Sequence, residues 1–119
     1  MVKTLVFGAS TNPSRYSNLA IRRWLENNIE TVAFGVREGT VSEVQIKTNL
    51  GDFQNVHTIT LYINPTRQTE YYQQILDLKP QRVIFNPGTE NPELFQMLTK
   101  AGIKAENSCT LVLLATGQF

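Results

Sequence analysis

The feature that most constrains this chain is the segment 3–17, in which a short apolar strand runs directly into a polar loop that begins with glycine. The loop, GASTNPSR, also carries a proline and an arginine, and a helical pattern follows it. In chains that alternate strands and helices, the first such turn commonly holds phosphates, because backbone N–H groups and the positive helix end face the ligand. The segment therefore predicts an anion-binding turn and says much less about catalysis.

Size and composition limit the class of protein. A chain of 119 residues can bury one core and forms a single domain, and 41% hydrophobic and 18% charged residues are typical of a globular fold. The net charge of +1 gives no general attraction to nucleic acid or to an anionic membrane. Cys109 is the only cysteine, which excludes an internal disulfide and favours a reducing compartment. We expect a cytoplasmic protein with neither a secretory signal nor a membrane span.

Four short runs predict buried strands, since they are rich in β-branched or aromatic residues and end at turn residues: 4–7, 31–34, 59–63 and 82–85. A weaker strand is expected at 104–106, and the alternating residues 44–46 are expected to form an edge. Helical patterns occupy 17–28 and 66–78, and Pro80 stops the second. The last helix has the clearest ends, with Asn91 as N-cap, Pro92 in the first turn and Gly102 at the close.

The order of these elements predicts a Rossmann-like α/β fold: an open, mostly parallel sheet of five to six strands with helices on both faces, in one domain. Ligands of such sheets bind beyond the carboxyl ends of the strands. There the chain places small and turn-forming residues together with Arg15, Arg37 and Arg67. Each of these loops has an ordinary structural explanation, but their combination with three arginines favours a binding site.

The arginines point to an anionic ligand. Arg15 lies in a loop too polar for the core, and a guanidinium suits bidentate contact with phosphate. Arg67 lies in the first turn of its expected helix, where a cation opposes the helix dipole unless an anion is close by, although it could equally be a solvated surface residue. The loop has one glycine where the dinucleotide fingerprint has three, and Gly35-Val36-Arg37 replaces the acid that would hold a ribose 2′-hydroxyl. A ligand with a phosphorylated ribose, such as NADP or coenzyme A, fits better than NAD.

Other reactive residues give weaker signals. His57 stands alone, so a structural role is expected and no metal site is predicted. Cys109 is either a small buried hydrophobe or a thiol of lowered pKa near a helix start, facing the ligand. Ser10 has no partnering base, so a hydrolase triad is not supported. Tyr71 and Tyr72 are expected to pack rather than react.

Four stretches carry a resemblance to a known family: VFGASTNPSRYSN at 6–18, YINP at 62–65, NPGTEN at 86–91 and AGIKAENSC at 101–109. With these motifs the chain resembles the stand-alone coenzyme A-binding proteins that are related to the N-terminal domain of the succinyl-CoA synthetase alpha subunit. The resemblance implies a Rossmann-like domain that holds the ADP portion of coenzyme A. The phosphohistidine segment of the synthetases, which lies in a second domain, has no counterpart here.

By position, the resemblance assigns the pyrophosphate to Gly8, Ala9, Ser10 and Arg15, and the adenine and ribose to the region 35–39. It places Asn64, Pro65 and Gly88 beside the nucleotide and the start of the pantetheine arm. The full set of expected ligand-binding residues is Gly8, Ala9, Ser10, Pro13, Arg15, Ser17, Asn18, Gly35, Val36, Arg37, Asn64, Pro65, Arg67, Asn86, Pro87 and Gly88. Relatives usually carry Asn-Pro-Lys-like residues after the second strand. Here Glu38 adds a negative charge beside the expected ribose phosphate.

Three functions stay open on the sequence alone. The leading hypothesis is a binding protein for coenzyme A or an acyl-CoA that carries out no catalysis of its own. The second is an NADP-linked or acyl-transferring enzyme. The third is a regulatory module that binds a protein partner or forms a homo-oligomer, with a vestigial cleft. In that case residues 111–114 and the end 117–119 would form the association surface, although packing of the apolar run on the sheet is favoured.

Overall fold

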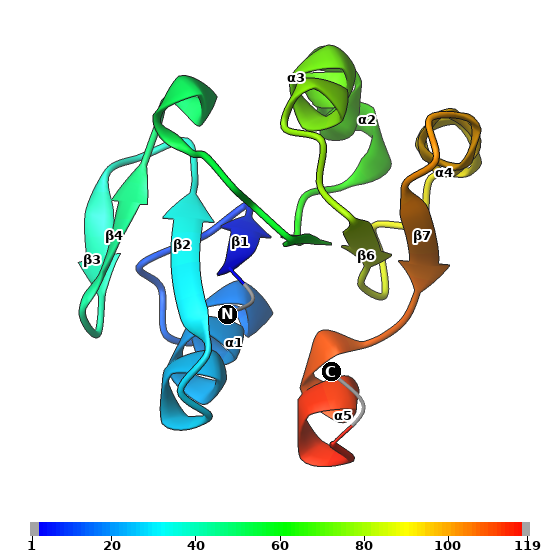
Figure 1. Cartoon of the computed structure of the whole chain (residues 1–119). Helices are drawn as coiled ribbons and strands as arrows, with labels where there is room; N and C mark the ends of the chain where they lie inside the picture. The colour runs from blue at the N-terminus through cyan, green and yellow to red at the C-terminus, as the bar shows by residue number, and fades with distance from the viewer. Residues whose placement is uncertain (1–2, 118–119) are drawn as a thin grey trace.

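A seven-stranded sheet runs through the centre of the protein, seen here in a computed structural model that describes residues 3–117 (Figure 1). The spatial order of the strands is β3-β4-β2-β1-β5-β6-β7, and every neighbouring pair is parallel except β3 and β4. The strands are β1 (Lys3–Phe7), β2 (Glu30–Phe34), β3 (Gly39–Val41), β4 (Val44–Lys47), β5 (Thr58–Leu61), β6 (Arg82–Phe85) and β7 (Lys104–Asn107). The predicted open, mostly parallel α/β sheet is confirmed.

The sheet is larger than the expected five to six strands, because residues 39–47 form a hairpin at one edge. β3 is only three residues long and contains a glycine, so its sequence carries almost no strand signal. It pairs antiparallel with β4, while β4 pairs parallel with β2. The segment 44–46 was expected to form an edge strand, but it belongs to β4, which is the second strand from the edge.

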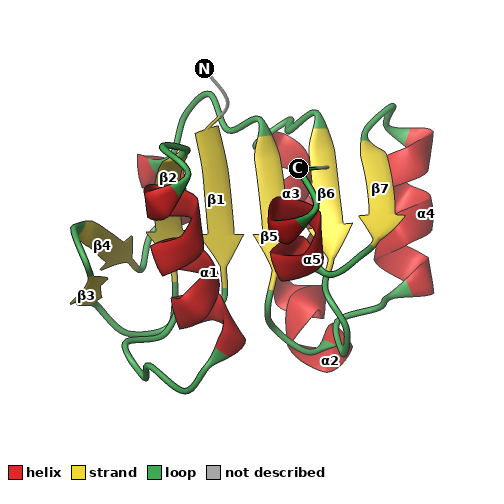
Figure 2. Ribbon diagram, turned by 90° about the horizontal axis from the view of Figure 1, so that it is seen from below, coloured by secondary structure: helices red, strands yellow, loops and turns green. Residues whose placement is uncertain are grey.

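The helices cover both faces of the sheet (Figure 2). They are α1 (Tyr16–Glu26), α2 (Pro65–Gln68), α3 (Tyr72–Asp77), α4 (Pro92–Lys100) and α5 (Thr110–Ala115), with short 3₁₀ turns η1 (Leu50–Asp52) and η2 (Thr69–Tyr71). On one face α1 packs with α5, and Trp24 of α1 is fully buried against Val6 and Ala33. On the other face, α3 and α4 cover Phe7, Phe85 and their neighbours. The run 111–114 contributes Leu111 and Leu114 to the first of these cores, as the favoured packing alternative expected.

The helix predicted over 66–78 is broken into α2, η2 and α3. Two consecutive tyrosines explain the break. The Tyr71 ring packs edge-on against Phe7 and Phe34, at centroid distances of 5.3 and 5.5 Å, while the Tyr72 hydroxyl accepts a hydrogen bond from Asn91. The backbone leaves helical geometry at Tyr71, with φ −108° and ψ 2°, and both tyrosine side chains are half-buried. Packing was the role expected for both tyrosines.

The ends of α4 match the prediction closely. The Asn91 side chain accepts a hydrogen bond from the Leu94 N–H, and Pro92 occupies the first turn. At the other end, Gly102 has φ +80°, and the Ile103 N–H reaches back to the Leu98 carbonyl at 2.9 Å. This is a Schellman closure, which also brings two buried aliphatic side chains together.

The connections place a crevice next to β1. The chain leaves β1 toward β2 through α1 on one face, and it leaves β5 toward β6 through α2 and α3 on the opposite face (Figure 2). Neighbouring strands whose connections diverge in this way form a topological switch point, where ligands of doubly wound sheets bind. A ligand-binding site is therefore expected at the carboxyl ends of β1 and β5.

Candidate functional site

Three loops meet at the carboxyl ends of β1, β2 and β5, and two glycines allow the contact. Gly8 has φ +103°, and a Cβ there would lie 2.5 Å from the Ile63 Cγ2. A Cβ on Gly35 would lie 2.6 Å from the Ala9 carbonyl oxygen. The N–H groups of Gly8 and Ala9 both donate to the Phe34 carbonyl. The structure thus brings the predicted segments 8–10 and 35–37 together beside the end of β5.

The start of α1 lacks the residues that usually neutralise a helix N-terminus. Arg15 occupies the N-cap position with an extended backbone, it makes no side-chain cap hydrogen bond, and the first turn contains no acid. The first N–H groups and the positive end of the helix dipole are therefore not satisfied by a capping side chain. Asn18, in the first turn, instead donates from its amide to the Ser10 carbonyl and accepts from Arg22, so it ties the loop to the helix.

The loop between β1 and α1 is also shaped by its own short polar side chains. The Asn12 N–H donates to Ser10 Oγ at 3.1 Å, and the Ser14 N–H donates to Asn12 Oδ1 at 3.0 Å. Because these two N–H groups donate within the loop, they are not available to a ligand. Residues 11–16 are all exposed, although Thr11 lies against Gly39 of β3.

Arg15, Arg37 and Arg67 are all exposed, and within residues 3–117 none of them forms an ion pair. Arg67 lies in the first turn of α2, as expected, but this helix is only four residues long. Arg67 therefore lies in the last turn of this helix as well as in its first. Its backbone N–H donates to Asn64 Oδ1, so Asn64 serves as the N-cap of α2.

A buried amide joins the loop after β5 to the loop after β6. Gln68 is fully buried, and its amide nitrogen donates to the Ile63 carbonyl at 2.9 Å and to the Thr89 carbonyl at 2.8 Å. Its oxygen accepts from the Asn91 amide at 2.9 Å. Sequence reasoning missed Gln68, because a single glutamine in a polar helical stretch gives no periodic signal.

Asn86 forms a second buried connection at the same end of the sheet. Its amide nitrogen donates to Thr60 Oγ1 and to the Leu61 carbonyl, and its oxygen accepts from the Thr110 N–H. This bond satisfies the start of α5. Asn86, expected to bind the ligand, thus has its amide engaged inside the protein, as Asn18 does.

The other predicted residues lie at the surface of this rim to different degrees. Ala9, Ser17 and Gly35 are buried, Gly8, Ser10 and Pro65 are half-buried, and Pro13, Val36, Asn64, Pro87 and Gly88 are exposed. Val36 is notable for an aliphatic side chain that is 62% exposed, and Tyr16 at the start of α1 is 73% exposed. Two large apolar side chains therefore stand in solvent on the segments that carry Arg15 and Arg37.

Tyr62 and Cys109 lie together on the α5 side of the rim. Burial raises the pKa of Tyr62 to about 12, the thiol of Cys109 adds to the rise, and the hydroxyls of Thr60 and Thr110 act against it. Tyr62 is therefore a neutral phenol at physiological pH. Cys109 is half-buried at the N-cap of α5, which is intermediate between the two roles expected for it.

His57 lies far from this rim, at the amino end of β5, where its Nδ1 is 2.8 Å from Thr58 Oγ1. Within residues 3–117, no cluster of three or more His, Cys, Asp or Glu side chains could hold a metal ion. In the same part of the chain, no helix is long and apolar enough to cross a membrane.

The fold and the rim place this chain among the Rossmann-like, doubly wound α/β domains, and comparison with known proteins narrows the class. A solved structure titled only as an uncharacterized protein is 44% identical, with a TM-score of 0.96 over 100% of this chain and 98% of its own. A protein from Thermus thermophilus, cell-free ID.343, has 20% identity and a TM-score of 0.88, covering 99% and 90% of the two chains. A conserved hypothetical protein from Pyrococcus furiosus has 21% identity and a TM-score of 0.83, covering 94% and 98%.

A family model described as a CoA binding domain matches residues 2–115. The chain therefore belongs to the CoA-binding domain family, which supports coenzyme A binding in general. A search of the curated proteins finds no match. The resemblance drawn from the motifs at 6–18, 62–65, 86–91 and 101–109 is confirmed at the level of the family.

Proposed function

We propose that this protein binds coenzyme A or an acyl-CoA through the ADP portion of the ligand, at the loop between β1 and α1, without catalysing a reaction itself. The observation that carries the proposal is the uncapped start of α1, where Arg15 stands in place of a capping side chain and no acid follows. A pyrophosphate would supply the negative charge that the helix start lacks. Membership of the CoA-binding family supports the same choice of ligand.

The segment after β2 would hold the adenosine. Val36 offers an exposed apolar surface for the adenine ring, and Arg37 follows it as a cation for a phosphate on the ribose. Glu38 weakens this second contact by its negative charge. The adenosine end would therefore be held more weakly than the pyrophosphate.

The absence of catalysis is proposed from the reactive groups at this rim. Ser10 Oγ accepts a hydrogen bond from the Asn12 N–H, and His57 lies at the opposite end of the sheet. Tyr62 is held in its neutral form by its raised pKa of about 12. Ser10, His57 and Tyr62 therefore do not form a nucleophile paired with a base.

Thermal unfolding in the presence of coenzyme A tests the proposal. A ligand that binds only the folded state raises the unfolding temperature, and at about 100 times its dissociation constant it stabilises by about 2.7 kcal/mol. We expect Arg15→Ala to abolish the shift. The matched control Arg23→Ala removes an exposed arginine from the same helix and should leave the shift intact.

Two results would redirect the assignment. The absence of any shift at millimolar coenzyme A would reject the proposal. A shift with NADP instead, lost in Arg37→Ala, would favour the NADP-linked enzyme, for which the position of Arg37 after β2 is the supporting observation.

A further inference from the structure

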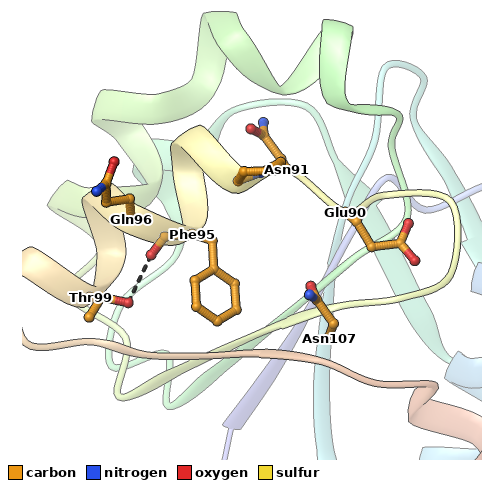
Figure 3. Close-up of a pocket in the computed structure, with 7 residues that line it drawn as sticks. Glu90, Asn91, Phe95, Gln96, Thr99 and Asn107 are labelled. Atoms are coloured by element: carbon orange, nitrogen blue, oxygen red, sulfur yellow. Dashed lines mark hydrogen bonds between the residues drawn. The ribbon is translucent and has the colours of Figure 1, made fainter.

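A groove of about 560 Å³ lies between α4 and the carboxyl end of β7, and none of the residues proposed to hold the ADP portion lines it (Figure 3). The Phe95 ring points into it, with Glu90 and Asn107 on one side of the ring and Gln96 and Thr99 on the other. We call it the Phe95 groove. Phe95 is half-buried and forms the floor of the groove. Its ring centroid lies 5.9 Å from that of Phe85, which belongs to the core. The volume is within the range of small-molecule sites.

Hydrogen bonds connect the wall of the Phe95 groove to the loops after β5 and β6. The Glu90 carboxylate in its wall accepts a hydrogen bond from the Gly88 N–H at 2.8 Å. Its neighbour Asn91 donates to Gln68, which in turn holds the Ile63 carbonyl in the loop after β5. One hydrogen-bonded framework therefore shapes both the groove and the end of β5.

The register of the sheet gives the spacing of the strand ends from which the two sites extend. Phe7 pairs with Leu61, Leu61 with Phe85, and Phe85 with Asn107, so these residues form one row across four strands. Three steps of about 4.8 Å separate the ends of β1 and β7 by roughly 14 Å. A pantetheine arm has about the length of four extended residues, which is also roughly 14 Å.

The lining of the Phe95 groove favours a neutral chain with an apolar end. It includes no lysine or arginine, and its single charge is the carboxylate of Glu90. Gln96, Thr99 and Asn107 are exposed and neutral, which suits the amide groups of a pantetheine arm. An aromatic floor suits sulfur and short hydrocarbon groups. A phosphate or a carboxylate would find no cationic partner there.

We propose that the Phe95 groove receives the sulfur end and the acyl group of an acyl-CoA, and that it selects short, neutral, apolar acyl groups over free coenzyme A and over acyl groups that end in a carboxylate. This inference rests on the proposed function, because it requires the ADP portion to be anchored at the loop between β1 and α1. It adds the class of acyl group to that function.

Isothermal titration calorimetry with a ligand series tests the proposal and separates it from the function on which it rests. The series is adenosine 3′,5′-bisphosphate, coenzyme A, acetyl-CoA, butyryl-CoA and succinyl-CoA. We expect the affinity to rise about fourfold for each methylene buried between acetyl and butyryl. Succinyl-CoA should bind at least tenfold more weakly than butyryl-CoA, and Glu90→Gln should narrow that gap.

Two variants test the groove itself. Phe95→Ala removes the floor, and Gln96→Trp fills the groove from an exposed position without altering the core. Both should abolish the preference for butyryl-CoA while leaving the affinity for adenosine 3′,5′-bisphosphate unchanged. Gln74→Trp, at an exposed position on α3, is the matched control and should keep the full preference.

The outcomes are distinguishable. If the bisphosphate and coenzyme A bind but the acyl series is flat, or if Gln96→Trp keeps the preference, the inference is wrong and the proposed function stands. If neither the bisphosphate nor any thioester binds the wild-type protein, the proposed function and this inference both fall.

Discussion

The starts of α1 and α4 are both found at the carboxyl edge of the sheet, yet the chain treats them in opposite ways. At α4, the Asn91 side chain caps the Leu94 N–H, Pro92 removes one donor, and Glu93 supplies a negative charge in the first turn. At α1, the cap position holds Arg15, there is no cap hydrogen bond, and the first turn has no acid. Both segments are polar, so composition alone does not separate them.

The difference lies in which groups satisfy the helix donors. The loop before α4 is closed by its own residues and adds buried hydrogen bonds to Gln68 and Tyr72. The loop before α1 bonds within itself, through Ser10 and Asn12, and leaves the helix start to solvent or to a ligand. A helix without a capping side chain is less stable by about 1 kcal/mol, and a bound anion can restore this stability.

The largest expected effect on stability comes from replacing an asparagine by alanine in each of the two loops, before α4 and before α1. Asn91→Ala removes the cap of α4 and takes a hydrogen-bond donor from the buried Gln68 amide oxygen and from the half-buried Tyr72 hydroxyl. We therefore expect a loss of about 3 kcal/mol in the free energy of unfolding. Asn12→Ala removes only exposed hydrogen bonds with Ser14 and should cost less than about 1 kcal/mol. Urea unfolding at neutral pH measures both. Equal losses would show that the loop before α1 is as tightly built as the loop before α4.

The sequence predicted the framework of this comparison well, because strong local signals define it. The buried strands 4–7 and 82–85 and both ends of α4 follow from apolar runs and capping residues, which act over a few positions. The family motifs also pointed to the loop between β1 and α1, and the match over residues 2–115 confirms the family.

What the sequence could not predict depends on contacts between distant segments. β3 appears only because β4 lies beside it, and the break between α2 and α3 follows from where Tyr71 and Tyr72 can pack. The Gln68 connection joins residues 21 positions apart, and the Phe95 groove needs β7 beside α4. The assignment of ligand contacts to Gly8, Arg15 and the other predicted residues stays a prediction.

Tyr62, which follows β5 at the same edge of the sheet, is a buried group whose contribution to stability depends on pH. Its pKa is raised from 10.0 to about 12 by burial, so the folded state holds its proton more tightly than the unfolded state does. The stability this provides is fully present below pH 10 and is lost as the pH rises toward 12. Relative to Tyr62→Phe, the wild-type protein should lose about 0.8 kcal/mol by pH 10.5 and about 1.4 kcal/mol by pH 11.

Urea unfolding of both proteins at several pH values between 8 and 11 measures this difference. Tyr16→Phe controls for the loss of a hydroxyl as such, because Tyr16 is 73% exposed. A stability difference between wild type and Tyr62→Phe that does not change over this range would mean that Tyr62 is not held in its neutral form by the fold.

The smallest expected effect tests the uncapped start of α1 directly. Arg15 has the extended backbone of an N-cap residue, with φ −82° and ψ 143°, so Arg15→Asp places a capping carboxylate there without a change of backbone. We expect the ligand-free protein to gain about 0.5 kcal/mol of stability and to lose its thermal response to coenzyme A. Arg23→Asp makes the same change of charge in the last turn of α1, where a carboxylate meets the negative end of the dipole, and should lower stability slightly while keeping the response. A gain of stability together with a loss of binding would mean that the helix start is kept open for an anion at a cost to the fold. If Arg15→Asp instead binds coenzyme A as the wild-type protein does, the two helix starts differ for a reason unrelated to the ligand.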